Sequence, residues 1–336
     1  MQQLTFANSR HLSGFWRKWS VFILLLAPIV FLFIANPVFR QPGNLFNLWQ
    51  QSSIIGTLAV GQTMVIILGG FDLSVGAVAA AAGVLCYLIF NAGNGPLIVT
   101  LGIFGSLLAC AAIGAANGVL VTKINITPLI ATLGMLSLVR GFVLVISGGR
   151  LVYAEGVGYS LSDFLQGSVL GMPVSGVIFI ILALLIGYIL RGTILGQYVF
   201  AIGGNERAAT LSGIPVTTVK IIAYSTCGTL AGIGGILLAS RTASALPDAG
   251  TDYELQAITA AVIGGANLGG GKGSITGTVL GVFLLTAIGN GLNLYNVSPF
   301  WQTGVTGAIL LLAVGFSSAD FKKLGLTGKL RSTTGR

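Results

Sequence analysis

The apolar stretch VSGVIFIILALLIGYIL, residues 174–190, contains no charged side chain and is followed at once by Arg191. A helix needs about 20 such residues to cross the hydrocarbon core of a bilayer. Similar stretches recur along the chain, and only 7% of its 336 residues are charged, against about 25% in soluble domains. Because so few charges cannot cover a solvated surface, the sequence predicts an all-α, polytopic integral membrane protein.

Ten stretches qualify as membrane-spanning helices, and the eighth is short and interrupted by glycine. They are Trp19–Ala35, Leu48–Leu68, Ser74–Phe90, Leu97–Val121, Pro128–Ser147, Val174–Leu190, Ile221–Ser240, Leu255–Leu268, Ile275–Leu294 and Phe300–Phe316. The first follows basic residues as a signal peptide would, but Phe33-Ile34-Ala35 is a poor cleavage site, so we expect it to stay as a span. The predicted organisation is a tail 1–18, a membrane domain 19–316 and a tail 317–336.

The basic residues divide unevenly between the two sides of this arrangement. With the N-terminus inside, 13 of the 17 fall in inside segments. These are Arg10, Arg17, Lys18, Lys123, Arg191, Arg207, Lys220, Lys272, Lys322, Lys323, Lys329, Arg331 and Arg336. Cytoplasmic loops carry such an excess, and removing one span would reverse every later loop. The distribution therefore predicts ten spans with both termini in the cytoplasm.

Several other classes of protein are disfavoured by the composition. The net charge of +9 is dispersed between apolar spans and forms no single basic face for nucleic acid. Cys86, Cys110 and Cys227 each lie in an apolar run without a CxxC pair, so they predict buried thiols rather than a disulfide or zinc site. His11 has no second metal ligand near it. We therefore expect no metal and no bound cofactor.

Catalytic and nucleotide-binding patterns are also missing. In the glycine-rich segment 264–274, Lys272 is followed by Gly273, whereas a phosphate-binding loop has Ser or Thr there. No Ser-His-acid set and no pair of facing carboxylates occurs, so we expect no enzyme. No acidic residue lies deep in a predicted span, which lowers the case for an ion-coupled secondary transporter, the alternative function.

The segment 191–220, on the predicted inside, contains the signals of a short helix over Asn205–Ser212. Asn205 can cap its N-terminus, Glu206 in the first turn suits the helix dipole, and Gly213 can end it in a left-handed conformation. A helix of about two turns is not stable alone and must pack on a partner, either its own membrane domain or another protein. The competing interpretation is an ordinary connecting loop.

Two glycine-rich breaks interrupt the spans, at 69–76 and at 264–274. Similar sequences, VIILGG at 65–70 and AVIGG at 261–265, precede them and hint at an internal repeat of parallel sense. Asp72 or Ser74 can simply cap the next helix, or the break can line a transport path. Arg140, within an apolar run, either has a function or reaches the interface with its long side chain.

These segments resemble the permease subunits of bacterial ABC importers for ribose, xylose and arabinose, and the ribose-type permeases most of all. Four motifs match in order over roughly residues 40–316: LGGFDLSVG at 68–76, ATLG at 131–134 with Arg140-Gly141, IGGNERAATLSGI at 202–214, and YELQAI at 253–258 with AAVIGG at 260–265 and GGKG at 270–273. Phe71, Asn267 and Gly269 depart from the usual residues of that family. Ribose, other pentoses, hexoses and related furanose-like molecules all fit as solutes.

The resemblance implies a permease in the bacterial inner membrane that has no ATPase of its own. Two such chains, identical or closely paralogous, would enclose the path. A cytoplasmic ATPase would bind ATP and magnesium, and a periplasmic binding protein would deliver the solute. The implied ATPase-coupling residues are Gly203, Gly204, Asn205, Glu206, Arg207, Ala208, Ala209, Ser212, Gly213 and Ile214. The candidate path residues are Asp72, Ser74, Thr132, Arg140 and Asn267, and the candidate binding-protein contacts are Asp248, Asp252 and Glu254.

Overall fold

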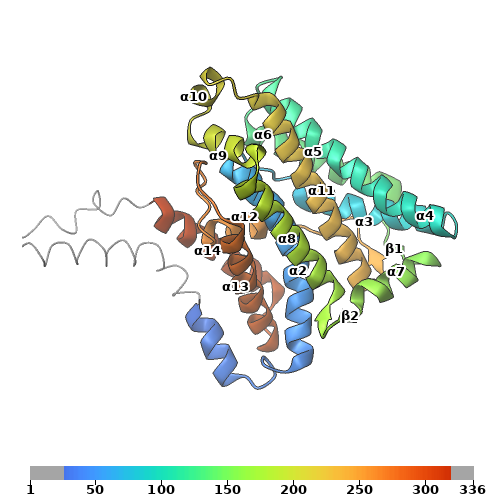
Figure 1. Ribbon diagram of the computed structural model, residues 1–336. Coiled ribbons are helices and arrows are strands. Elements are labelled where there is room, and N and C mark those ends of the chain that lie inside the picture. The colour runs from blue at the N-terminus through green and yellow to red at the C-terminus, as the bar shows by residue number, and fades with distance from the viewer. Residues whose placement is uncertain (1–25, 319–336) are drawn as a thin grey trace, which may run out of the picture.

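The computed structural model describes residues 26–318, and helices dominate it (Figure 1). A first helix covers Leu26–Ala35. The others are α2 Pro42–Ile67, α3 Val75–Asn91, α4 Pro96–Thr100, η1 Leu101–Gly105, α5 Ser106–Thr122, α6 Pro128–Ser147, α7 Val157–Gln166, α8 Val174–Gly192, α9 Ile194–Gly204, α10 Glu206–Leu211, α11 Val216–Thr242, α12 Tyr253–Ile263, α13 Ile275–Leu294 and α14 Pro299–Ser318. The short strands are β1 Val152–Tyr153, β2 Ser168–Val169, β3 Met172–Pro173 and β4 Ser244–Ala245.

A helix occurs at every one of the ten predicted spans, the first being described from Leu26 onward. Among the described residues, five helical stretches are long and apolar enough to cross a membrane: Pro96–Thr122, Pro128–Ser147, Val174–Gly192, Val216–Thr242 and Ile275–Leu294. The prediction of an all-α polytopic membrane protein is confirmed. His11 and most of both predicted tails lie outside the described residues.

Helices α2, α3 and α11 form the buried centre of the bundle. Helix α11 packs against α5, α2 and α3, and glycine makes its closest approaches possible. A methyl carbon added at Gly114 of α5 would lie 2.2 Å from the carbonyl oxygen of Tyr224, and one added at Gly228 would lie 2.4 Å from that of Cys110. Such close backbone contact between helices is typical of packing in membranes. The three cysteines are buried and unpaired.

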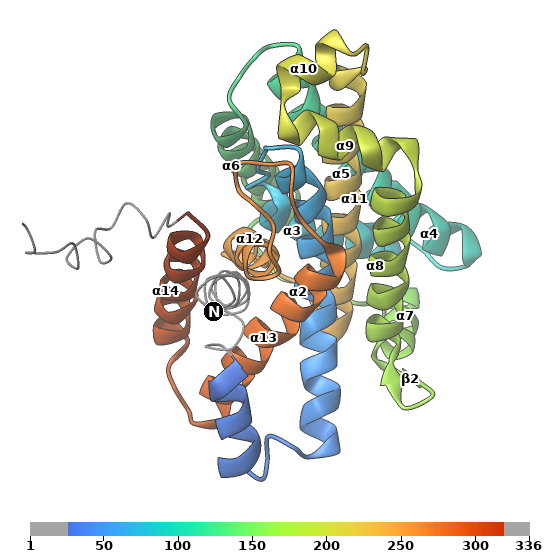
Figure 2. The same ribbon diagram turned by 60° about the vertical axis from the view of Figure 1, so that its left-hand side comes forward.

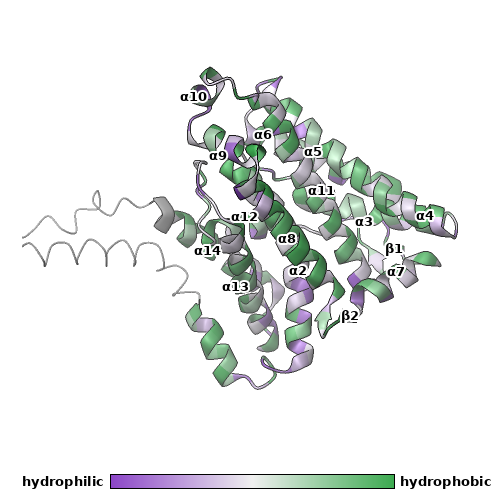
Figure 3. Cartoon of the chain, in the orientation of Figure 1, coloured by the Kyte–Doolittle hydropathy of each residue, from purple (hydrophilic) through white to green (hydrophobic). Residues whose placement is uncertain are grey.

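The outer helices expose apolar side chains, as a lipid-facing surface does. Leu138 of α6 and Leu184 of α8 are both 69% exposed. The hydrophobic colours of Figure 3 cover α5, α6 and α8, whereas hydrophilic colours appear at the lower end of α2. Because lipid solvates apolar groups, these helices need no further cover.

Two helices fall in segments that the sequence led us to expect as loops. Helix α7 lies in 148–173, where Gln166 donates a hydrogen bond to the carbonyl oxygen of Ser240 at 2.9 Å. Helix α9 contains 11 residues, too few to span a bilayer, so hydropathy did not separate it from the loop around it. The β2–β3 hairpin turns at Leu170 and Gly171, and β1 pairs with β4.

Loops predicted to share one side of the membrane do share one end of the bundle. The end with α9 and α10, called here the coupling face, also holds the connections 68–74 and 264–274. There the Gly271 N–H donates to the Ile67 carbonyl oxygen at 2.8 Å. At the opposite end lie α7 and the strands (Figures 1 and 2). Helices α2 and α12 both end at the coupling face. This agrees with the parallel sense of the internal repeat that the similar sequences at 65–70 and 261–265 suggest.

Candidate coupling site and broken helices

The predicted short helix is present as α10, Glu206–Leu211, with both predicted caps. The side chain of Asn205 accepts a hydrogen bond from the Ala208 N–H at 3.0 Å. Gly213 has φ +79°, and the Ile214 N–H donates to the Ala209 carbonyl oxygen at 3.1 Å, which closes the C-terminus. The local sequence therefore fixes where this helix begins and ends.

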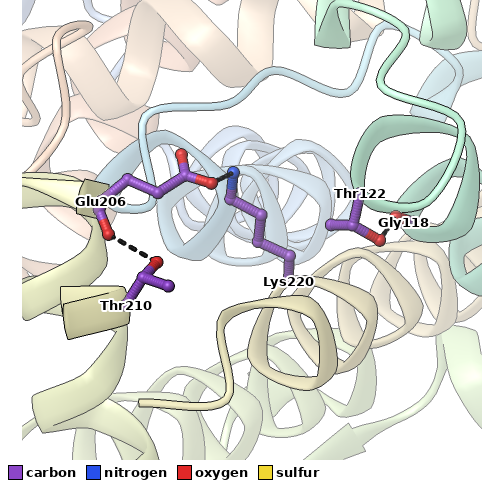
Figure 4. Close-up of polar contacts among 5 residues, drawn as sticks. All are labelled: Gly118, Thr122, Glu206, Thr210 and Lys220. Carbon is purple, nitrogen blue, oxygen red and sulfur yellow. Dashed lines mark hydrogen bonds and ion pairs between the residues drawn. The ribbon is translucent and has the colours of Figure 1, made fainter. Parts of the chain in front are cut away.

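Helix α10 rests on the bundle by one side only. Ala209 is its buried residue, while Leu211 is 83% exposed. Figure 4 shows Lys220 of α11 reaching the carboxylate of Glu206, at 2.7 Å, and the Thr210 hydroxyl donating to the Glu206 carbonyl oxygen, at 2.9 Å. The nearby Thr122 hydroxyl donates to the Gly118 carbonyl oxygen of its own helix at 2.7 Å. The exposed side of α10 is therefore available to another molecule.

Helix α9 is joined to both glycine-rich breaks through five glycines, called here the glycine junction: Gly69, Gly203, Gly204, Gly270 and Gly271. A methyl carbon at Gly203 would lie 1.7 Å from the Ile67 carbonyl oxygen and 2.6 Å from the Gly271 nitrogen. One at Gly270 would lie 2.7 Å from the Gly203 carbonyl oxygen and 3.0 Å from the Cα atom of Gly69. Three segments far apart in sequence thus touch backbone to backbone.

This contact has a mechanical consequence. Protein interiors are close-packed and transmit strain rather than absorb it. A displacement of α9 must therefore move the end of α2 and the segment that leads into α13, because no flexible side chain separates them at Gly203. The glycine junction connects the segment 191–220, the candidate coupling loop, directly to two helices of the bundle.

The break between α2 and α3 is held by a buried polar network around Asp72. The carboxylate of Asp72, 1% exposed, accepts from the backbone N–H of Ser74 at 2.9 Å and from its hydroxyl. The side-chain amide of Asn117 on α5 donates to Asp72 at 3.3 Å and to the Ser74 hydroxyl at 2.9 Å. Burial of a carboxylate is costly unless its oxygens are bonded in this way.

Two further side chains complete the network from neighbouring helices. With its amide oriented to suit its neighbours, Gln62 of α2 donates to the Asp72 carbonyl oxygen and accepts from the Asp72 N–H, both at 3.1 Å. The hydroxyl of Tyr224 on α11 donates to the Phe71 carbonyl oxygen at 3.2 Å. The irregular backbone at 71–72 is thus satisfied inside the protein, as the hydrocarbon region requires.

The chain between α11 and α12 also turns back into the bundle. Ala245 packs beside Gly83 of α3, and Gly250 packs beside Gly76, seven residues earlier on that helix and about 10 Å away along its axis. Helix α12 therefore starts beside the start of α3. With 11 residues it is about 16 Å long, roughly half of a span. The predicted eighth span, Leu255–Leu268, is a half-length helix.

Arg140 of α6 stabilises this re-entrant segment. One nitrogen of its guanidinium group donates to the Pro247 carbonyl oxygen at 2.7 Å and to the Ala249 carbonyl oxygen at 2.9 Å. The side chain therefore neither points freely to an interface nor lies without a partner. It supplies donors to carbonyl groups that lie outside regular secondary structure.

Two carboxylates lie where the N-termini of α3 and α12 meet. The Glu254 side chain packs so closely on Gly76 that a methyl carbon there would lie 2.5 Å from Oε2. Asp72 lies just before α3 on the other side. Helix N-termini carry partial positive charge, so the two carboxylates favour the close approach of these two ends.

The structure separates the remaining predicted residues. Thr132 is buried and its hydroxyl donates to the Pro128 carbonyl oxygen of its own helix at 2.8 Å. Asn267 is exposed and accepts from the Gly269 N–H at 3.0 Å within its own turn. Asp248 is exposed, whereas Asp252 is part-buried at the start of α12. Of the five candidate path residues, Asp72 and Ser74 are brought together, and the role of all five stays a prediction.

Sequence reasoning missed Gln62, Asn117 and Tyr224, which lie in the middle of apolar spans. Their signal was present, because polar side chains inside a span usually find partners within the bundle. In residues 26–318, no three His, Cys, Asp or Glu side chains gather as a metal site would require.

Comparison with known proteins gives a consistent result. The model of the family described as "Branched-chain amino acid transport system / permease component" matches residues 44–314. The ribose import permease protein RbsC of Escherichia coli is 41% identical over 94% of this chain and 98% of its own length. RbsC of Bacillus subtilis is 40% identical over 90% of this chain and 94% of its own length.

A third relative, the D-allose transport system permease protein AlsC of Escherichia coli, is 35% identical over 89% of this chain and 91% of its own. No solved structure matches this one. The match covers the broken helices, the re-entrant segment and the coupling loop together, within a fold of many apolar helices. The chain is therefore a multi-pass membrane protein that belongs to the family of transport-system permease components.

Proposed function

We propose that this chain is the membrane-spanning permease subunit of an ATP-driven, binding-protein-dependent importer of a sugar, a ribose-like pentose or a related carbohydrate, in the bacterial inner membrane. The family description mentions branched-chain amino acids, but the relatives that match nearly the whole chain are named for ribose and allose. Family membership also sets aside the alternative of an ion-coupled carrier.

The observation that carries the proposal is the coupling loop. A capped helix with one buried residue presents its other residues to a partner, and the helix before it touches two broken helices through the glycine junction. A cytoplasmic ATPase that binds ATP and magnesium would seat α10 in a groove. Its closure would push α9, and the rigid bundle would switch between two packings. A second permease chain and a periplasmic binding protein would complete the importer.

The test is uptake by the complete importer in proteoliposomes, with the permease, its ATPase and its binding protein. We expect uptake of D-ribose or a related sugar that requires ATP, stops when the ATPase is omitted, and continues in the presence of a protonophore. L-leucine serves as the control solute. ATP-driven uptake of L-leucine without sugar uptake would contradict the assignment of a sugar, and sugar uptake abolished by the protonophore alone would contradict ATP coupling.

A further inference from the structure

A cavity of about 410 Å³ lies between α2, α12, α13 and α14. In Figure 2, α12, α13 and α14 lie to the left of the central helix α2. The cavity extends from the ends of α13 and α14 opposite the coupling face, near Leu292 and Pro299, to Leu285 and Ile309 deeper in the bundle. Its volume falls in the range of about 300–1,000 Å³ that is usual for small-molecule sites.

The lining of this cavity combines apolar side chains with several polar ones. Its polar members are Gln51, Asp252, Gln256, Thr286, Gln302, Thr303 and Thr306. No protein group in residues 26–318 hydrogen-bonds the side-chain amide of Gln51 or of Gln256. Each amide can donate twice and accept on its oxygen, so both can bind another molecule. An amide without a partner is costly in hydrocarbon, which indicates that water or a solute reaches the cavity.

The third amide is fixed in place. The Gln302 side chain donates to the Asn293 side-chain oxygen at 2.7 Å and to the Val297 carbonyl oxygen at 3.0 Å. Its own oxygen remains able to accept. The Thr306 hydroxyl donates to the Gln302 carbonyl oxygen at 3.0 Å and can also accept. The cavity thus combines one orientated amide, two amides without partners among residues 26–318, hydroxyl groups and the Asp252 carboxyl group, together with apolar side chains such as Ile55 and Leu285.

We propose that this cavity is a binding chamber in which a neutral, polyhydroxylated solute stops on its way through the membrane. Hydroxyl groups of such a solute both donate and accept, as the amides do, and its C–H faces suit the apolar side chains. The solute class rests on the proposed function. The chamber itself rests on the cavity and its lining, and none of the five sequence-predicted path residues lines it.

The chamber is linked to the coupling face through its own walls. Gln51 lies on α2, whose last residue, Ile67, touches Gly203 of α9 and accepts from the Gly271 N–H. Gln256 lies on α12, which leads through segment 264–271 to the same glycine junction. Movement of α9 would therefore shift the walls formed by α2, α12 and α13 relative to α14, which would change the width of the chamber and its affinity for the solute.

Cysteine labelling tests the chamber independently of transport. Gln256→Cys and Thr306→Cys would be placed separately in the complete importer and exposed to sulfonatoethyl methanethiosulfonate, a charged thiol reagent. Leu184→Cys, on the apolar outer side of α8, is the control. We expect the control to react at least about tenfold more slowly, because hydrocarbon excludes a charged reagent. Equal rates at all three positions would overturn the chamber.

Protection by solute tests what the chamber binds. We expect D-ribose to slow the labelling of Gln256→Cys and L-leucine to leave it unchanged. If D-ribose is imported but does not slow the labelling, the binding chamber is wrong and the proposed function stands. If L-leucine protects and D-ribose does not, the polyhydroxylated class of solute is wrong together with the proposed function.

Discussion

Arg140 shows how one side chain can allow irregular backbone inside a membrane protein. Its two hydrogen bonds to the Pro247 and Ala249 carbonyl oxygens serve a segment that no helix satisfies. A carbonyl group left unpaired in a buried position costs about 1–3 kcal/mol. The charge is thus retained within an apolar helix because it has defined acceptors.

Replacing Arg140 by leucine should lower the thermal stability of the purified permease and reduce transport, because the re-entrant segment loses both donors. Arg140→Lys should restore little of the lost stability or transport, since an ammonium group does not reproduce the planar guanidinium geometry. The measurement is the melting temperature in detergent. Arg150→Leu, at an exposed position, is the matched control and should change stability by less than about 0.5 kcal/mol. Equal effects at both positions would contradict this role.

Asp72 is a second residue whose surroundings explain its position. Its carboxylate accepts from Ser74 and Asn117, while the side-chain oxygen of Asn117 is buried without a partner among the described residues. The site therefore holds one acceptor more than it needs. An amide in place of the carboxylate would bring both a donor and an acceptor.

We expect Asp72→Asn to fold and insert, because the new amide oxygen can still accept from the Ser74 N–H and its nitrogen can donate to a rotated Asn117. Asp72→Leu should fold poorly, because the Ser74 N–H and hydroxyl then lose their acceptor in a buried site. The yield of monodisperse protein after detergent extraction measures the difference. Similar yields from the two variants would show that the network is not what holds this break.

At the scale of elements, two adjacent glycines of the glycine junction, Gly203 and Gly204, have very different surroundings. Gly203 is closed in by the Ile67 carbonyl oxygen, whereas a methyl carbon at Gly204 would have no neighbour within 4 Å. Both are helical positions next to each other at the end of α9. They differ because only one of them faces the bundle.

Gly203→Ala should therefore disrupt the seating of α9 and uncouple ATP hydrolysis from uptake, while Gly204→Ala should remain close to wild type in both. ATPase activity and solute uptake by the complete importer are the two measurements. A larger residue at Gly204, such as Trp, should instead weaken binding of the ATPase, because that side is open to a partner. Equal coupling in Gly203→Ala and Gly204→Ala would show that the junction transmits no movement.

At the scale of the whole molecule, the two ends of the bundle must face opposite sides of the membrane. Leu170, at the tip of the β2–β3 hairpin, is 99% exposed, and Leu211 of α10 is 83% exposed. The β2–β3 hairpin and α10 lie at opposite ends of the bundle in both views (Figures 1 and 2). The excess of basic residues predicts that the end with Leu211 faces the cytoplasm.

A membrane-impermeant maleimide should therefore label Leu170→Cys in intact spheroplasts and label Leu211→Cys only after permeabilisation. The native thiols give little background because Cys86, Cys110 and Cys227 are each 0% exposed. Labelling of Leu211→Cys from outside would reverse the orientation and remove the basis for an ATPase-coupling loop.

The sequence by itself determined the class of the protein, the positions of the apolar helices and the limits of α10. These properties are local. Hydropathy acts over about 20 neighbouring residues, and Asn205 and Gly213 act within a turn or two of the helix that they cap. The short helix α9 was missed because its apolar length fits neither a span nor a polar loop.

Only the tertiary structure decided which residues act together. It placed the start of α12 beside the start of α3, and it paired Arg140 with carbonyl groups more than a hundred residues away. It also enclosed Gly203 against the bundle while leaving the neighbouring Gly204 open. It likewise enclosed the cavity of the proposed chamber, whose lining includes Gln51 and Gln256 from two different helices. The physical reason is that contact and enclosure depend on which surfaces of distant helices meet, and neither composition nor spacing along the chain specifies that meeting.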